Sequence, residues 1–211
     1  NGRDGVCSGA ACPTTGAPGR IGDAARFDGN DQVTVAMRVA DAPQFTLAAW
    51  AALDTLDEWD NLIQFGGSYC VLLYSYVSDV YSRTLVLTIP TTDGRKYLKA
   101  SNVLARADAF YHIVGAYDGN TMRLYVNGQQ VGSQIAPGLH YPGCNNQVVL
   151  GRWMRGALDE VRIFNRALSS AEVQALYLDT GGQPTLRLPF DERRAVGGGA
   201  DSTAEVTVTA E

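Results

Sequence analysis

The sequence has no long apolar run and little charge. No stretch approaches the ~20 apolar residues of a membrane-spanning helix, and no N-terminal segment resembles a signal peptide. The net charge is −5 and there is no basic run, whereas a protein that binds a phosphate backbone needs a basic patch. The sequence therefore predicts no membrane insertion and no nucleic-acid partner.

Motifs that indicate catalysis are also missing. The chain has two histidines, His112 in a predicted strand and His140 in a loop rich in Pro and Gly. It has no G-x-S-x-G elbow, no G-x-G-x-x-G after a strand, no phosphate-binding loop and no H-E-x-x-H. We therefore expect His112 to be a packed, hydrogen-bonded residue, and we expect no enzymatic activity.

What the sequence does contain is typical of an all-β protein. Its 211 residues include 23 glycines and ten tyrosines, and many short segments alternate apolar and polar residues between turn signals. The clearest lie at residues 45–53 and 111–133. Within residues 111–133, two turns, DGN and NG, predict a three-stranded meander. A chain of this size can form one β domain. We therefore predict a jelly-roll sandwich of two antiparallel sheets.

One helix is expected late in the chain. Ser169, with Glu172 three residues later, forms a capping box, and Val173, Leu176 and Tyr177 have helical spacing. The two glycines at 181–182 are expected to end this helix. A parallel α/β fold would need recurring helices, which the pattern does not contain.

The four cysteines form an even set that allows three pairings. We favour Cys7–Cys12, which closes a short loop, and Cys70–Cys144, which would join distant parts of a sheet. These bonds predict an oxidising, extracellular or cell-surface setting. The alternative is four reduced thiols, and paired C-x₂-C spacing for zinc is absent.

The segment GALDEVRIF at 156–164 raises a problem. As a regular strand it would place Asp159 on the same face as Val161 and Ile163, and a buried carboxylate needs a compensating partner. Glu160 and Arg162 would share the opposite face as an exposed ion pair, which contributes little to stability.

Five segments together resemble the laminin-G-like domains of the concanavalin A-like lectin/glucanase superfamily. In order they are RFDGNDQVTV, FTLAAW, YHIVGAYDGNTMRLYVNGQQVG, VVLGRW and GALDEVRIFNRALSSAEVQALY, within residues 24–178. The resemblance implies a jelly-roll sandwich that serves as a non-catalytic, extracellular module for glycan binding or adhesion. A second possibility is a structural spacer or protein-interaction module in a tandem-repeat surface protein.

The resemblance also implies a structural calcium ion held by Asp159 together with the turn FDGND. The predicted ligands are Asp28, Gly29, Asn30, Asp31 and Asp159. Calcium takes six to eight oxygens, and this turn offers carboxylates, an amide and carbonyls. Two alternatives remain open: Asp159 accepts N–H bonds from a loop, or a bulge shifts its face by one residue.

Glucanases of the superfamily carry acids that alternate along one strand. The closest match, DEWDNLI at 57–63, has Glu58 and Asp60 but an isoleucine at 63. The segment follows a strand like a loop, so we expect its acids to be solvated.

Aromatic side chains could bind a sugar, because a sugar ring has apolar C–H faces. The candidates are Trp59, Tyr74, Tyr76, Tyr141 and Trp153, of which Tyr74 and Tyr76 share a strand face. For each residue taken singly, packing in the core is the alternative. The ligand is thus expected to be a glycan or an extracellular protein.

The ends of the chain suggest a rotated family pattern. The C-terminal stretch TLRLPFDE resembles the strand with which such modules begin, and the chain opens with NGRDG. We expect one domain at 1–190, with 185–190 returning as a strand, and an extension or the start of a next repeat at 191–211. The tail EVTVTAE could be another strand or a flexible linker. The chain is expected to be one module of a larger protein.

Overall fold

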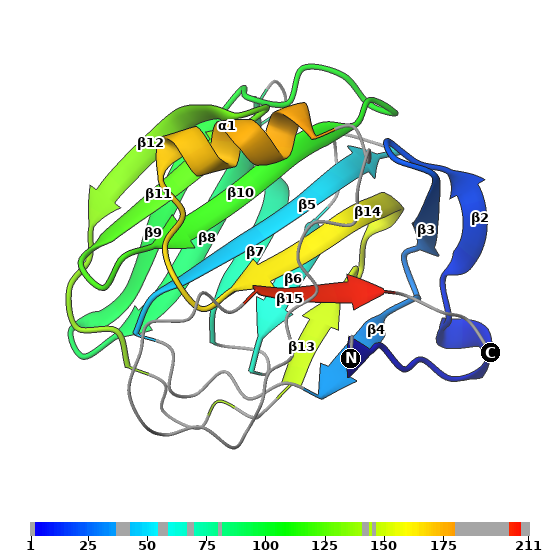
Figure 1. Cartoon of the computed structure of the whole chain (residues 1–211), viewed down its shortest axis with the longest axis horizontal. Coiled ribbons are helices and arrows are strands. Elements are labelled where there is room, and N and C mark those ends of the chain that lie inside the picture. Colours follow the sequence, from blue (N-terminus) through cyan, green and yellow to red (C-terminus); the bar gives the residue numbers. More distant parts are fainter. Residues whose placement is uncertain are drawn as a thin grey trace.

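The structure is a sandwich of two antiparallel sheets with one helix on its outside (Figure 1), as the sequence predicts. It is a computed structural model that describes residues 3–36, 43–54, 59–66, 70–79, 82–140, 144, 147–179 and 203–207. Within these residues, no helix is long and apolar enough to cross a membrane.

The larger sheet has nine strands in the described part of the chain. Its order is β1 (Arg3–Asp4), β15 (Thr203–Thr207), β14 (Arg155–Phe164), β5 (Phe45–Leu53), β10 (Tyr111–Tyr117), β11 (Thr121–Val126) and β12 (Gln129–Ile135). Two further strands extend it, since β3 (Asp23–Asp28) pairs with β14 and β2 (Thr14–Pro18) pairs with β3. A short 3₁₀ turn, Gly9–Ala11, precedes β2.

The smaller sheet has six described strands. Its order is β4 (Val33–Ala36), β13 (Gln147–Leu150), β6 (Asp60–Phe65), β7 (Leu72–Asp79), β8 (Ser82–Thr91) and β9 (Gly94–Ser101). The main apolar core lies between the two sheets and includes Phe45, Leu47, Leu73 and Leu87. Strand β5 is buried on both faces. Its inward residues, such as Phe45 and Leu47, pack in the core, whereas Ala48 and Trp50 point out of the sandwich and are covered by other groups.

Helix α1 (Ser170–Leu178) covers the outer face of the nine-stranded sheet (Figure 1). Its capping box forms as predicted: Ser169 Oγ accepts from the Glu172 N–H, and the Glu172 carboxylate accepts from the Ser169 N–H at 2.7 Å. Val173 packs with Val114, Ala116 and Tyr125, so this face is closed by a second, smaller apolar cluster. The glycines at 181–182 lie outside the described residues.

The predicted meander is formed by β10, β11 and β12. Asn127 and Gly128 have φ values of +50° and +79°, which is the conformation that an NG hairpin turn requires. A Cβ atom built on Gly128 would lie 2.4 Å from Gln174 Oε1. This glycine therefore allows both the turn and the close approach of α1.

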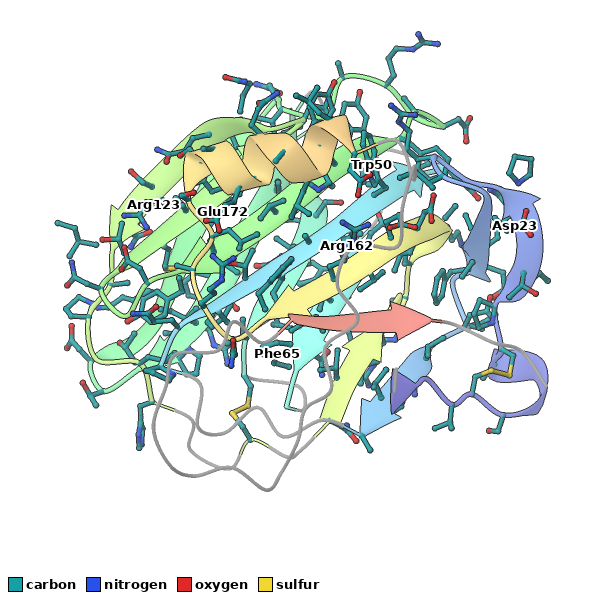
Figure 2. The ribbon with its side chains drawn as sticks, in the orientation of Figure 1. Asp23, Trp50, Phe65, Arg123, Arg162 and Glu172 are labelled. Atoms are coloured by element: carbon teal, nitrogen blue, oxygen red, sulfur yellow. A yellow bond between two sulfur atoms is a disulfide. The ribbon has the colours of Figure 1, made fainter. Side chains whose placement is uncertain are left out.

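Both predicted disulfides are present, Cys7–Cys12 and Cys70–Cys144, and both appear as yellow bonds in Figure 2. The first joins residues five positions apart, and the second joins residues 74 positions apart. The described residues include no free cysteine, which removes the alternative of reduced thiols.

The proposed returning strand at 185–190 lies outside the described residues, so the domain limits stay predictions. The tail does supply a strand. β15 pairs antiparallel with β14 and parallel with β1, with Arg162 opposite Glu205 and Arg3 opposite Val206.

Candidate functional site

Three of the predicted ligand-binding aromatics gather on the outer face of the six-stranded sheet. The ring centroids of Trp59 and Tyr74 are 4.6 Å apart with an interplanar angle of 13°, so the two rings stack. Tyr76 lies 5.6 Å from Trp59 and 6.0 Å from Tyr74. Trp59 is 47% exposed whereas Tyr74 is 5% exposed, so one face of the indole is turned to solvent and the other covers Tyr74. We call Trp59, Tyr74 and Tyr76 the aromatic platform.

Strand register explains why the platform faces outward. Leu73, Leu85 and Leu87 point into the core, so their neighbours along β7 and β8 point away from it. Tyr74 therefore stands opposite Val86, and Val86 stands opposite Lys99 of β9. The whole row lies on one face of the sheet.

Burial beneath Trp59 changes the acidity of Tyr74. Desolvation raises the pKa of the Tyr74 phenol to about 12, and Tyr76 and Tyr97 add to the shift while Arg95 opposes it. Tyr74 is therefore neutral at physiological pH, and its hydroxyl can both donate and accept a hydrogen bond.

Two buried amides lie beside the platform, and the sequence interpretation missed them. Asn61 stands opposite Tyr74, and Gln64 stands opposite Leu72. Asn61 Nδ2 donates to Gln64 Oε1 at 2.9 Å, but Asn61 Oδ1 and Gln64 Nε2 have no hydrogen-bond partner in the structure. The residues are only 3% and 2% exposed, and an unpaired buried polar group costs about 1–3 kcal/mol. An acceptor and a donor thus remain unused next to the platform.

The other two predicted aromatics are not part of this cluster. Trp153 lies in the turn between β13 and β14, is 54% exposed, and carries the Arg152 guanidinium 4.3 Å from its ring centroid. Tyr141 lies outside the described residues.

The predicted face of Asp159 is wrong because β14 contains a bulge. Asp159 pairs with Trp50 and Arg162 pairs with Ala48, so two residues of β14 stand against one of β5. Glu160 takes up the extra residue with φ +48°. Asp159 therefore points out of the sandwich beside Trp50, whereas Leu158, Val161 and Ile163 point into the core.

Asp159 finds its partner in a loop. The Ile21 N–H donates to Asp159 Oδ2 at 2.8 Å, and a Cβ atom built on Gly19 would lie 2.6 Å from the same oxygen. Both alternatives considered for this residue, the bulge and the loop N–H, are thus observed. Glu160 and Arg162 do form an ion pair, but it is half-buried rather than exposed, and Arg162 also contacts Asp179 at 3.3 Å.

The five predicted calcium ligands do not converge. Asp28 pairs with Arg155, four residues before Asp159 on β14, a separation of about 13 Å along the strand. Asp28 and Asp31 line a cavity of about 430 Å³ that is also lined by Arg26 and Arg155. Both carboxylates already accept hydrogen bonds within the turn. The Asp31 carboxylate accepts from the Asp28 N–H, and the Asp28 carboxylate accepts from the Asn30 N–H. Gly29 lies against Arg155, because a Cβ atom built on Gly29 would be 2.9 Å from Arg155 Nε.

These residues fit a calcium ion in ligand type but not in number. Calcium takes six to eight oxygens, and the nearby guanidinium groups oppose a second positive charge. Among the described residues, no group of three or more His, Cys, Asp or Glu side chains is placed to hold a metal. Calcium binding therefore stays a prediction.

The expectation that Asp60 is solvated is wrong. Asp60 is buried, with Oδ2 accepting from Arg83 at 2.9 Å and Oδ1 accepting from the Arg155 N–H at 3.1 Å. Arg83 also donates to Ser75 Oγ at 2.9 Å. A carboxylate held in this way fixes the start of β6. Glu58 lies outside the described residues.

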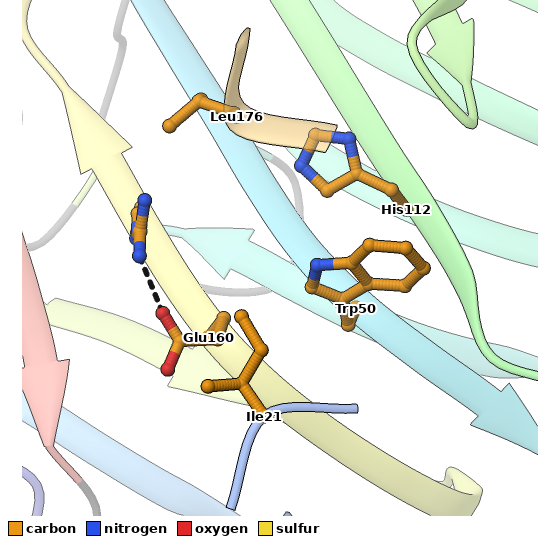
Figure 3. Close-up of a pocket in the computed structure, with 6 residues that line it drawn as sticks. Ile21, Trp50, His112, Glu160 and Leu176 are labelled. Carbon is orange, nitrogen blue, oxygen red and sulfur yellow. Dashed lines mark hydrogen bonds and ion pairs between the residues drawn. The ribbon is translucent and has the colours of Figure 1, made fainter. Parts of the chain in front are cut away.

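His112 is buried on the outer face of the other sheet, as Figure 3 shows, in the wall of a small pocket with Trp50, Glu160 and Leu176. The pocket holds about 10 Å³, roughly the space of one water. Burial, with the charge of Arg162, lowers the pKa of His112 to about 4, and its Nδ1 has no partner in the structure. A neutral imidazole packed 5.3 Å from the Trp50 ring is a structural residue here.

Sequence comparison identifies a family. Residues 27–174, more than half of the chain, match the family model described as the Concanavalin A-like lectin/glucanases superfamily. A search of curated protein sequences finds no match.

Solved structures with the same fold share little sequence with the chain. Domain 4 of the extracellular arabinanase AbnA from Geobacillus stearothermophilus, in complex with arabinotriose, has a TM-score of 0.64 and 18% identity over 83% of this chain and 86% of that one. A heptameric pentraxin from Limulus polyphemus has a TM-score of 0.58 and 16% identity, covering 79% and 80%.

The binding domain of Paraclostridial Mosquitocidal Protein 1 has a TM-score of 0.61 and 17% identity over 78% of this chain, which spans only 45% of that domain. At this level of identity, the three structures establish the architecture alone.

Proposed function

The chain belongs to the Concanavalin A-like lectin/glucanases superfamily, and we propose that it is a non-catalytic carbohydrate-binding module. The observation that carries the proposal is the aromatic platform, in which Trp59 is stacked on Tyr74 and leaves one indole face open to solvent. Such a rigid, flat, apolar surface matches the C–H face of a sugar ring.

Polar groups beside the platform could serve the rim of the sugar. Tyr76 is half-buried next to Trp59, and Tyr97 on β9 is 46% exposed on the same face. Phenolic hydroxyls can donate to and accept from sugar hydroxyls. Support by analogy comes from the arabinanase domain, which was solved with arabinotriose.

A catalytic role is not part of the proposal. Retaining and inverting glycosidases need two carboxyl groups facing one substrate. Asp60, which follows Trp59 in the chain, is buried in a pair with Arg83 and accepts from the Arg155 N–H. Its carboxylate is committed to the fold.

The test is a glycan array followed by calorimetric titration with the best ligand. We expect saturable binding by the wild-type chain and loss of at least tenfold in affinity in Trp59→Ala. Trp153→Ala is the matched control, since it removes an exposed tryptophan from outside the platform. Silence across the array would reject glycan binding and favour the alternative of a spacer or protein-interaction module.

The setting of the module is proposed to be extracellular, on the support of the two disulfides. Calcium stabilisation is proposed for the turn at 28–31 without Asp159. With arginines close by, we expect an affinity no tighter than the ~10⁻⁴–10⁻³ M of extracellular modules. Melting scans with calcium and with chelator test this, and identical melting temperatures would remove calcium from the proposal.

A further inference from the structure

Strand β9 presents a row of alternating cationic and aromatic side chains. Arg95, Tyr97 and Lys99 stand opposite Pro90, Thr88 and Val86, so they share the outer face of the six-stranded sheet with the aromatic platform. Arg95 and Lys99 lie about 13 Å apart along the strand. Lys99 Nζ is 5.7 Å from the centroid of the Tyr76 ring, which places its charge at the edge of the platform.

The positive charges of β9 differ in what they contact. Lys96 points to the other face and pairs with Asp93 at 2.8 Å. Arg95 donates to Cys70 O at 3.0 Å and to Thr88 Oγ1 at 3.1 Å, so it is tied to the scaffold but retains its charge. Lys99 is exposed, and its contact with Tyr76 is a cation–π interaction that leaves the ammonium donors free for another group.

The surrounding face contains no compensating acid among the residues whose side chains the structure describes. The outward positions of β6 to β9 with described side chains are Asn61, Gln64, Leu72, Tyr74, Tyr76, Thr84, Val86, Thr88, Pro90, Arg95, Tyr97, Lys99 and Ser101. Two of these thirteen are cationic and none is anionic, although the whole chain carries a net charge of −5. Among the described side chains of β6 to β9, this face is therefore locally positive on an acidic protein.

We infer that the platform selects anionic glycans, with Lys99 binding a sugar carboxylate or sulfate while an adjacent ring stacks on Trp59. The inference rests on the proposed glycan-binding function and adds the class of its ligand. A lysine is a point charge without a planar fork, so carboxylate and sulfate are both acceptable to it. Single-stranded nucleic acid would also combine stacking with charge, but two cations on a chain of net charge −5 are a small electrostatic footprint for a phosphate backbone.

The experiment compares matched pairs of glycans on one array: oligogalacturonate with its methyl ester, sialylated with desialylated oligosaccharides, and sulfated with desulfated ones. The wild-type chain is expected to bind the charged member of at least one pair more tightly, and the preference is expected to shrink between 50 and 500 mM NaCl. Which pairs respond distinguishes a carboxylate from a sulfate ligand.

Substitutions of one lysine then locate the selectivity. In Lys99→Gln, we expect a loss of about twofold to fivefold for the charged glycan, the range of an exposed ion pair, and no change for its neutral partner. Lys99→Glu is expected to lose more, and Lys96→Gln to lose nothing. Circular dichroism of each variant checks that the fold is kept.

Two results would overturn this inference but not the proposed function. One is equal binding of charged and neutral glycans by the wild-type chain, and the other is displacement of the bound glycan by an oligo-dT strand at equal concentration. In the first case, loss of binding in Trp59→Ala would still support the proposed function. Absence of any glycan binding would overturn both.

Discussion

The two outer faces of the sandwich carry similar aromatic stacks in opposite environments. On the nine-stranded sheet, Trp50 stacks on Tyr177 at 5.6 Å and contacts His112 at 5.3 Å. On the six-stranded sheet, Trp59 stacks on Tyr74 at 4.6 Å. Trp50 is 4% exposed because α1 and the loop at Arg20 cover it, whereas Trp59 is 47% exposed. The same ring chemistry is therefore structural where another element covers it and available for binding where none does.

The largest expected effect is on the covered stack. Trp50→Ala should lower the free energy of unfolding by about 3–5 kcal/mol, because it empties a packed site under α1. Chemical denaturation measures this. If Trp50→Ala cost less than ~1 kcal/mol, the covered face would not be the structural one.

Acid should affect the covered face next. The pKa of His112 is lowered to about 4 in the folded chain, so the unfolded chain binds more protons between pH 6.5 and 4. Stability present above pH 6.5 should be lost as the pH falls through this window, by up to ~3 kcal/mol. Denaturation at pH 7 and pH 4 tests it, and a variant His112→Gln that keeps the same pH dependence would contradict it.

On the open face, stability should instead fall as the pH rises. Because the pKa of Tyr74 is raised to about 12, stability is present below pH 10 and is lost as the pH rises from 10 to 12. Tyr74→Phe should reduce this loss while preserving the stack with Trp59. Spectrophotometric titration of the wild type against Tyr74→Phe measures the phenol directly.

Asp159 provides a smaller test of the covered face. Asp159→Ala leaves the Ile21 N–H without its acceptor, which should cost about 1–3 kcal/mol, whereas Asp159→Asn keeps an acceptor and should cost less. Melting scans with and without calcium should show the same cost. A calcium-dependent difference would instead return Asp159 to a metal site.

The smallest effect on stability is expected at the open stack. Trp59→Ala should change the free energy of unfolding by less than ~1 kcal/mol, since half of the indole faces solvent. Its effect should appear in glycan affinity instead. A large loss of stability in this variant would mean that the two faces are built alike.

Several local features could be predicted because they depend on neighbours in the chain. The capping box at Ser169, the NG turn at 127–128 and the alternation of β5 each follow from residues a few positions apart. The shared face of Tyr74 and Tyr76 was predicted from the alternation of their strand and is observed. The pairing of Cys70 with Cys144 is also observed, and it was favoured because the other two cysteines lie close enough to close a short loop.

The errors have a common physical origin in positions where the pattern is interrupted. Glu160 adopts φ +48° with an ordinary side chain, so nothing in the letters marks the bulge that reverses the face of Asp159. Asp60 looked solvated because its partner Arg83 lies 23 residues away on another strand. The cationic row of β9 is visible in the letters RKYLK, but its relation to Trp59 depends on sheet order.

The sequence by itself determined the family, the sandwich of short strands and the late helix, because these arise from periodicity, turn chemistry and a matching order of segments. The tertiary structure decided which faces are covered. In the sequence Trp50 lies between two alanines and Trp59 between two acids, but only the packing of α1 over one sheet makes the first stack buried and leaves the second exposed.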